Sequence, residues 1–500
     1  MIETSTVKIN FRGGIISPGD LLDILEIVSS EYIQQVSFGL RQQLIILVRN
    51  DSLQNVLEQL MALDVDLEVN DDAYPNIMSS YPAEEMFIHS GWMSEGVYKD
   101  ILDALEHKPK LKINLSDSNQ SFTPLLTGNI NWVASSGSPH FWHLFIRFPQ
   151  TNHVIEWSEM VYTNDVARFS KDIEFLLTQK KANQTKDDIL MNETFFESIN
   201  KELYITKPAV QRVELPSFNL PYYEGLHKYG NKFWLGVYRR DEMFPVTFLK
   251  EICEICLQTK VGQLCSTPWK SIIIKGIADK DKYLWTNLLN KYEINMRHSA
   301  NELNFQVQDN DAEARKLKCY LVQKFNAMDL RTFGICIGIK TKPKSEIFCS
   351  VLIKKKSLFK LFGKTYFNRY DILCAKDFNP NERTSSVYMS NLSRPQLVIE
   401  LQQCVLWYYK RLVQKYDAGE ENQTISSKPA LVPDHYVHQC PHCLSIYDSE
   451  FGDLDHEIAA GIAFEQLPQR YACPVCEAPK TEFVKINLSS LKSQTVSSEA

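Results

Sequence analysis

The residues of this chain best suited to chemistry are four cysteines near its C-terminal end. They form two Cys-Pro-x-Cys pairs with 29 residues between the pairs: Cys440, Cys443, Cys473 and Cys476. Two cysteines separated by two residues can bind one metal ion together, and two such pairs complete a tetrahedral site of four sulfur ligands. Zinc and iron are the metals that such a site holds. We therefore expect these four cysteines to be metal ligands.

The segment between the two pairs favours iron. Two-pair zinc sites commonly hold their pairs about 15–20 residues apart, and the segment here is longer. The residues from Tyr436 to Ile486 resemble rubredoxin, the small one-iron electron carrier. The resemblance is carried by motifs between and after the pairs: Ile446-Tyr447-Asp448, Gly452-Asp453, Gly461-Ile462-Ala463-Phe464, Leu467-Pro468, Tyr471, Ala478-Pro479-Lys480 and Phe483.

This resemblance implies a one-electron carrier with one iron ion per chain, cycling between Fe2+ and Fe3+ on the four cysteine sulfurs. It also implies a small aromatic core beneath the metal, formed by Tyr447, Phe464, Tyr471 and Phe483. The alternative is zinc in the same site, which would make the chain a structural or regulatory subunit without redox turnover.

The sequence departs from the rubredoxin pattern next to the cysteine pairs. Rubredoxins usually have glycine directly after each pair, where this chain has Leu444 and Glu477. If the turn needs a left-handed backbone, each of these residues costs roughly 1 kcal/mol or more. Ser445 replaces an aromatic residue, and His438 and His442, which flank the first pair, are expected to face solvent. We expect these changes to affect the redox potential more than metal binding.

Composition predicts an ordinary globular chain of three or more domains, with 44% hydrophobic and 23% charged residues among 500. No apolar stretch approaches the roughly 18 residues that span a bilayer, so no membrane association is expected. The N-terminus does not read as a signal peptide. Eight cysteines outside the two pairs have no framework spacing, which is unusual in secreted proteins. We expect a cytoplasmic protein.

The negative charge is concentrated at the C-terminal end. Residues 434–486 contain nine acidic and three basic residues, a net charge of −6 out of −7 for the whole chain. An acidic face around a redox centre suits a basic redox partner protein, although solubility alone could explain it. Nucleic acid is not expected as a partner of so acidic a chain.

An internal repeat organises the N-terminal part. In each copy an extended segment precedes an amphipathic helix, and two further extended segments and a second helix follow. This is the β-α-β-β-α order of a ferredoxin-like half-domain. The first copy contains helical patterns at 21–28 and 56–61 and an extended run at 35–48. The second contains helical patterns at 248–256 and 283–289 with an extended run at 262–275.

This duplicated plan resembles the assimilatory nitrite and sulfite reductase family. The matching motifs are Leu40-Arg41-Gln42, Ser266-Thr267-Pro268-Trp269-Lys270-Ser271 and Lys110-Leu111-Lys112-Ile113. That family holds siroheme and a four-iron cluster with C-x5-C and C-x3-C cysteines, which this chain lacks. An active siroheme reductase is therefore not expected, and the N-terminal part is interpreted as a cofactor-free docking region.

Several other residues could be functional but have simpler interpretations. Arg41, Lys110 and Lys112 could bind an anionic tetrapyrrole or substrate, although solvated strand charges are the preferred interpretation. Cys253 and Cys256 imitate a redox pair but lie in a helical pattern, so buried small side chains are favoured. The remaining cysteines are interpreted as core residues: Cys265, Cys319, Cys336, Cys349, Cys374 and Cys404.

The predicted fold class is α+β, with duplicated ferredoxin-like half-domains and α+β lobes followed by a small rubredoxin-like domain. The expected parts are a half-domain (1–75), lobe 1 (76–215), a second half-domain (216–300), lobe 2 (301–416), a linker (417–433), the rubredoxin domain (434–487) and a disordered tail (488–500). We expect an electron-transfer protein without catalytic residues of its own, whose partner is a reductase or an enzyme of nitrite or sulfite assimilation.

Overall fold

The computed structural model divides into two compact units, Met1–Tyr409 and Lys410–Ala500. The structure describes the following residues: 3–87, 92–149, 154–180, 195–199, 201–210, 213, 215–294, 300–342, 347–361, 364–382, 384–426, 436–443, 445–449, 452–453, 456, 458–459, 461–474, 476 and 477–487. The fold is α+β, as predicted. No helix in this described part is long and apolar enough to cross a membrane.

The first half-domain is an antiparallel sheet with two helices. Its elements are β1 (Thr4–Asn10), β2 (Ile15–Ile16), α1 (Pro18–Ser30), β3 (Gln35–Phe38), β4 (Gln43–Arg49), α2 (Leu53–Ala62) and β5 (Leu67–Val69). Helix α1 begins where Ser17 caps it by accepting a hydrogen bond from the Asp20 amide. Leu21, Ile24 and Leu25 then bury one face of the helix, as the helical spacing of apolar residues predicts.

The second half-domain repeats this plan. Its elements are β12 (Gly225–Tyr229), β13 (Lys232–Val237), β14 (Phe244–Pro245), α6 (Val246–Thr259), β15 (Gln263–Ser266), β16 (Ile272–Ile277) and α7 (Lys282–Lys291). The two β-hairpins correspond in detail, because each turn places a residue in the left-handed region at the same position. These residues are Gln42, with φ 61°, and Lys270, with φ 55°.

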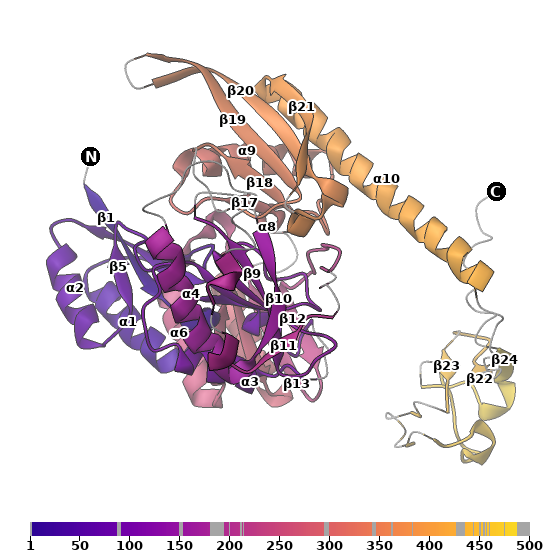
Figure 1. Cartoon of the computed structure of the whole chain (residues 1–500). Helices are drawn as coiled ribbons and strands as arrows, with labels where there is room; N and C mark the ends of the chain where they lie inside the picture. Colours follow the sequence, from indigo (N-terminus) through magenta and orange to yellow (C-terminus); the bar gives the residue numbers. More distant parts are fainter. Residues whose placement is uncertain are drawn as a thin grey trace. The chain divides into compact units, whose positions relative to one another are not determined.

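The two half-domains exchange short strands. Strand β2 of the first copy pairs with β15 of the second, with Ile16 opposite Leu264. Strand β14 of the second copy pairs with β3 of the first, with Phe244 opposite Val36. The sheet orders are therefore β14-β3-β4-β1-β5 and β12-β13-β16-β15-β2, and one hydrophobic core spans both copies. Figure 1 shows the first half-domain, with β1, β5, α1 and α2 labelled.

The two lobes also repeat one another. Lobe 1 contains β6 (Met78–Ser79), α3 (Glu95–Ala104), β7 (Ile113–Asp117), β8 (Ile130–Ala134), β9 (Phe141–Arg147), β10 (Val154–Tyr162), α4 (Val166–Lys180) and β11 (Thr206–Pro208). Lobe 2 contains α8 (Ala300–Asn304), β17 (Phe305–Val307), α9 (Ala312–Ala327), β18 (Ile337–Lys340), β19 (Val351–Leu361), β20 (Lys364–Ala375), β21 (Ser385–Leu392) and α10 (Arg394–Ser426). In both sheets the first three strands are parallel and the following strands antiparallel. The duplication therefore extends beyond the half-domains.

A buried ion network joins the second half-domain to its neighbours. The carboxylate of Glu242 accepts hydrogen bonds from Lys270 at 2.8 Å and from Lys318 of α9 at 2.7 Å. Lys270 also lies 3.2 Å from Asp309, whose carboxylate accepts from the amide of Leu40. The network therefore ties the second half-domain to lobe 2 and to the turn of the first half-domain.

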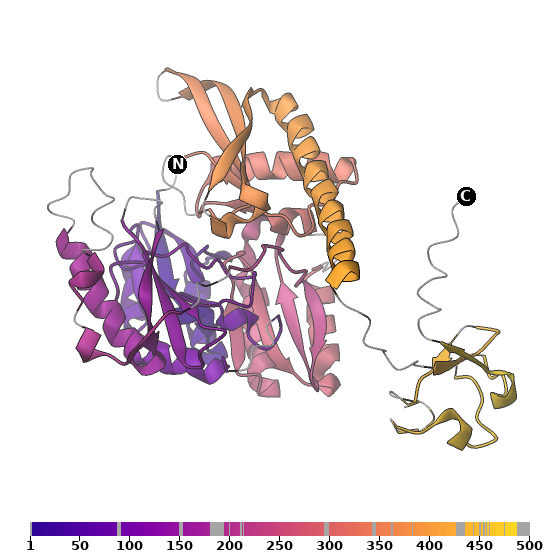
Figure 2. The ribbon, with the colours of Figure 1, turned by 45° about the vertical axis from the view of Figure 1, so that its right-hand side comes forward.

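Helix α10 lies beside β20 and β21 over its first turns (Figure 2). It is 33 residues long, whereas α4, its counterpart in lobe 1, has 15. The helix continues through Ser426, so the first residues of the predicted linker (417–433) are helical. The rest of the linker and the predicted tail (488–500) lie outside the described residues.

Candidate metal centre

The four predicted ligand cysteines come together at one end of a small three-stranded sheet. The sheet has the order β23-β22-β24, formed by Ile446–Tyr447, Tyr436–Gln439 and Val484–Asn487. Cys440 follows β22 directly, and the second pair lies on the loop that precedes β24. All four Sγ atoms lie within 4.8 Å of one another.

The sulfur positions fit one tetrahedral metal ion. The Sγ atoms of Cys440 and Cys476 are 3.5 Å apart, and those of Cys443 and Cys473 are 3.3 Å apart. Four thiolates at a metal–sulfur distance of about 2.3 Å would be roughly 3.8 Å apart. Among the described residues, these four cysteines are the only group of three or more histidine, cysteine, aspartate or glutamate side chains that lie close enough together to hold one metal ion.

Backbone hydrogen bonds shape the two cysteine turns in parallel fashion. The amide of Cys440 donates to the carbonyl of Ser445, and the amide of Cys473 donates to that of Ala478, both at 2.8 Å. Glu477 has φ 59°, the left-handed conformation expected from the glycine of the rubredoxin pattern. Leu444, its counterpart in the first turn, lies outside the described residues.

The two pairs are unequally buried. Cys440 and Cys473, the first cysteine of each pair, are buried, whereas Cys443 is half-buried and Cys476 is exposed. The site therefore has a protected side toward the module core and an accessible side that carries the second sulfur of each pair.

Ser445 is a site residue whose role sequence reasoning missed. Its Oγ atom lies 3.0 Å from the Sγ atom of Cys473. The hydroxyl and the amide of Ser445 also lower the pKa of the Cys443 thiol below its usual value. The available signal was a hydroxyl two residues after Cys443, which we interpreted only as the loss of an aromatic residue.

The predicted aromatic core lies beneath the cysteines. Tyr447, Phe464 and Tyr471 are buried in one cluster, with Phe483 packed against it. Phe483 also packs against the buried cysteines, so it connects the aromatic core to the site. The ring centroids of Phe464 and Phe483 are 5.3 Å apart. This expectation from the rubredoxin resemblance is confirmed.

The two histidines next to the first cysteine pair differ in their exposure to solvent. His442 faces solvent, as predicted, and its Nε2 lies 2.5 Å from a carboxylate oxygen of Glu482. The prediction was wrong for His438, whose side chain is only 14% exposed. Its ring stacks on Phe464 at 3.9 Å, so it takes the place of the aromatic residue that often precedes the first pair.

The cysteines of the N-terminal part are mostly buried, as predicted. Burial raises the pKa of Cys253 to about 12, which agrees with the interpretation of Cys253 and Cys256 as unreactive core residues. The prediction was wrong for Cys319, which is exposed on α9. Cys319 lies outside the buried face of α9, which carries Ala314, Leu317, Leu321 and Phe325.

The basic residues noted in the sequence also differ in burial. Lys110 is exposed, as expected for a solvated charge. Arg41 is buried instead, and its guanidinium donates to the carbonyls of Asn76 and Ile113. Burial lowers the pKa of Arg41 to about 9, and burial together with Arg41 lowers that of Lys112 to about 7. The preferred interpretation as a solvated charge was therefore wrong for Arg41.

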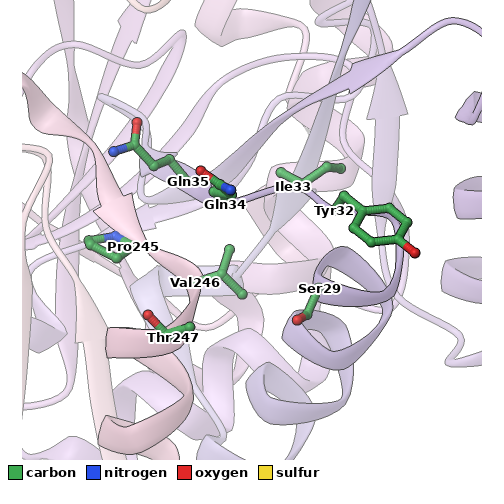
Figure 3. Close-up of a pocket in the computed structure, with 8 residues that line it drawn as sticks. All are labelled: Ser29, Tyr32, Ile33, Gln34, Gln35, Pro245, Val246 and Thr247. Carbon is green, nitrogen blue, oxygen red and sulfur yellow. The ribbon is translucent and has the colours of Figure 1, made fainter.

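A pocket of about 420 Å³ lies where the two half-domains meet (Figure 3). Its lining comes from the end of α1, the connection to β3 and the first residue of β3 on one side, and from the end of β14 and the start of α6 on the other. The lining residues are Ser29, Tyr32, Ile33, Gln34, Gln35, Pro245, Val246 and Thr247. None of these lining residues is charged or carries a thiol. The pocket therefore offers no thiolate, imidazole or carboxylate ligand for a redox metal.

Comparisons with known proteins assign the C-terminal module. The family model described as Rubredoxin matches residues 437–483. Rubredoxin-2 of Chlorobaculum tepidum is 50% identical over 48 residues, which cover 10% of this chain and 92% of that protein. The high molecular weight rubredoxin of Moorella thermoacetica is 28% identical over 111 residues, which cover 21% of this chain and 46% of that protein.

A solved structure resembles a larger part of the chain. The NirA protein of Mycobacterium tuberculosis matches with a TM-score of 0.56 at 14% identity, and the match covers 74% of each chain. At this identity the likeness concerns the fold alone. The resemblance predicted for the C-terminal module is thus confirmed in sequence, and that of the N-terminal part at the level of its fold.

Proposed function

Because the chain belongs to the rubredoxin family through residues 437–483, we propose that the sulfurs of Cys440, Cys443, Cys473 and Cys476 hold one iron ion per chain for single-electron transfer. The chain carries a rubredoxin-type electron carrier domain joined to a NirA-like region. The observation that supports this proposal most is the convergence of the four sulfurs within that domain.

The unequal burial of the four cysteines suggests different roles for the first and the second cysteine of each pair. Bound iron would supply a one-electron couple between the ferric and ferrous states. Cys440 and Cys473 would anchor it on the buried side, where Phe483 and the aromatic core keep water away. Cys443 and Cys476 lie on the accessible side, so electrons would enter and leave through their sulfurs.

A basic redox partner suits this accessible side. The module carries most of the net negative charge of the chain, and Glu477 lies next to the accessible Cys476. Complementary charge mainly raises the rate of association between redox partners. The partner would be a reductase, an enzyme of nitrite or sulfite assimilation, or both.

The N-terminal part would serve as a docking region without a redox cofactor of its own. Its fold is NirA-like, but it lacks the C-x5-C and C-x3-C cysteines that the reductase family uses. The two half-domains, interlocked by β2 and β14, provide a rigid body on which a partner enzyme could dock. We place the whole chain in the cytoplasm.

Metal analysis with a visible spectrum tests the proposal on protein purified natively. We expect about one iron per chain and thiolate-to-iron absorption that bleaches with dithionite. Zinc without visible bands, before and after reconstitution with ferrous iron, would instead establish the structural alternative. Reconstitution is needed because an expression host can load the wrong metal.

The docking role is tested separately with a full-length variant in which Cys443 and Cys476 are both replaced by serine. This variant should be colourless, should reduce neither nitrite nor sulfite, and should still bind the partner enzyme. Siroheme or a four-iron cluster extracted from the variant would show that the N-terminal part is itself a reductase.

A further inference from the structure

Two cysteines outside the metal centre are in direct contact. The Sγ atoms of Cys374, near the end of β20, and Cys404, on α10, lie 3.4 Å apart. Both residues are almost fully buried, with exposed fractions of 3% and 0%. Both are free thiols. A disulfide requires a sulfur–sulfur distance of about 2.05 Å, so only a small approach separates this contact from a bond.

Two stacked aromatic rings lie close in sequence and register to the two thiols, one on β21 and one on α10, a helical turn after Cys404. The rings of Tyr388 and Trp407 are stacked 5.8 Å apart at an interplanar angle of 21°. Tyr388 lies two residues after Ser386, the residue of β21 that is opposite Cys374, and burial raises the pKa of its phenol. Trp407 itself is 40% exposed.

The strand that carries Tyr388 is suited to opening. Strand β21 is the edge strand of its sheet, and most of its residues are exposed. Its pairing with β20 is irregular on both sides of Ile372, just before Cys374. An edge strand with interrupted pairing opens at lower free energy than the central strands of a sheet. Local opening would therefore give small molecules access to the two sulfurs.

We propose that Cys374 and Cys404 form a redox-active dithiol that low-molecular-weight disulfides oxidise to an intramolecular disulfide. The proposal is independent of the iron site. The bond would join β20 to α10, the helix that continues toward the C-terminal module.

The oxidation proceeds by two thiol–disulfide exchanges. The Cys374 thiolate attacks one sulfur of the small disulfide, whose sulfur–sulfur bond breaks, and the departing thiolate takes up the proton that Cys374 lost. Cys404 then loses its proton and attacks the Cys374 sulfur of the mixed disulfide, which expels the second small thiol. Two protein thiols are oxidised, and one small disulfide is reduced to two thiols.

The environment selects Cys374 as the first nucleophile. Cys374 lies on β20, which pairs directly with the edge strand β21, with Cys374 opposite Ser386. Cys404 lies on α10 and is fully buried, so opening of β21 reaches the Cys374 sulfur first. The thiolate is the attacking form, so the sulfur that small molecules reach first is the first nucleophile.

The test uses the full-length protein and oxidised glutathione, followed by alkylation of the remaining thiols, digestion and mass spectrometry. We expect a cross-linked peptide pair containing Cys374 and Cys404 that has lost two hydrogens and that reverts with dithiothreitol. The exposed Cys319 serves as an internal control, because it should acquire glutathione under the same conditions. Glutathione on Cys319 with Cys374 and Cys404 both fully alkylated would overturn the proposal.

Three variants test the order of reaction and the route of access. Cys404→Ser should trap glutathione on Cys374, whereas Cys374→Ser should leave Cys404 largely unmodified, and the reverse pattern would overturn the assigned order. Tyr388→Ala should accelerate cross-linking several-fold. Tyr283→Ala, which changes an exposed tyrosine of α7, should not change the rate. Equal rates for both tyrosine variants would exclude access beneath β21.

Discussion

The Oγ atom of Ser445 lies 3.0 Å from the Sγ atom of Cys473, so the turn of the first cysteine pair reaches a sulfur of the second. When Cys473 is a metal-bound thiolate, the hydroxyl can only donate. Hydrogen bonds to cysteine sulfur stabilise the more negative, reduced state of an iron–thiolate centre.

We therefore expect Ser445→Ala to lower the reduction potential. A hydrogen bond worth about 0.5–1.5 kcal/mol corresponds to roughly 20–60 mV for a one-electron couple. Spectroelectrochemical titration of the iron-loaded protein measures the shift. Ser445→Thr keeps the hydroxyl and should retain the native potential. Equal potentials in the alanine and threonine variants would show that this contact does not tune the site.

Replacing Cys443 with serine should abolish the native visible spectrum and unfold the C-terminal module, because so small a core depends on its metal. Absorption spectra and limited proteolysis of the full-length protein measure the two effects. The matched control is Cys319→Ser, which removes an exposed thiol outside the quartet and should leave the spectrum unchanged. Loss of secondary structure throughout the chain would contradict the independence of the two units.

Glu477→Gly should stabilise the module, because Glu477 holds a left-handed backbone with φ 59°. Relief of this strain is worth about 0.5–1 kcal/mol after the greater chain entropy of glycine is counted. The measurement is the midpoint of metal release in guanidinium chloride. Glu465→Gly, at an exposed position of a 3-10 helix, should be destabilising instead. A lower midpoint for Glu477→Gly would show that the turn has no strain to relieve.

Glu242→Gln should destabilise the N-terminal unit by about 3–5 kcal/mol at neutral pH, because it leaves Lys270 and Lys318 buried without their common carboxylate. Chemical denaturation followed by circular dichroism measures the loss. The control is Glu26→Gln, which removes the partner of Lys250 in a more exposed ion pair and should cost at most about 1 kcal/mol.

The same carboxylate predicts a dependence on pH. Burial alone would raise the pKa of Glu242, but Lys270 and Lys318 outweigh burial and lower it from 4.5 to about 2. A depressed folded-state pKa gives stability that is present above the unfolded value and is lost as pH falls through the folded value. The native protein should therefore lose about 3 kcal/mol between pH 4.5 and 2, and the glutamine variant should lack this component. Equal slopes for both proteins would contradict the assignment.

The C-terminal module was predictable because the residues that define it lie close together in the sequence. The spacing of the cysteine pairs identifies the sulfur ligands, and Tyr447, Phe464, Tyr471 and Phe483 lie close to them in the sequence. The left-handed backbone at Glu477 also followed from the pattern. The contact between Ser445 and Cys473 did not, because it depends on how the two turns face one another in space.

The N-terminal part was predictable in its order of elements but not in its long-range pairing. Strands of two residues, such as Ile15–Ile16 and Phe244–Pro245, carry no periodicity that a sequence could show. The burial of Arg41 was not predicted for a related reason. Three of its four hydrogen bonds go to the backbone carbonyls of Asn76 and Ile113, and one goes to the side-chain oxygen of Asn114. Backbone carbonyls leave no signature in the residue types.

The exchange of β2 and β14 has a consequence for biosynthesis. The outer edge of β3 is covered by β14, whose residues leave the ribosome long after β3. At about 5–20 residues per second, that edge stays open for roughly 10–40 s on every nascent chain. Unpaired edges of this kind recruit other strands. We expect the nascent first half-domain to need shielding by a chaperone until Phe244 and Pro245 emerge.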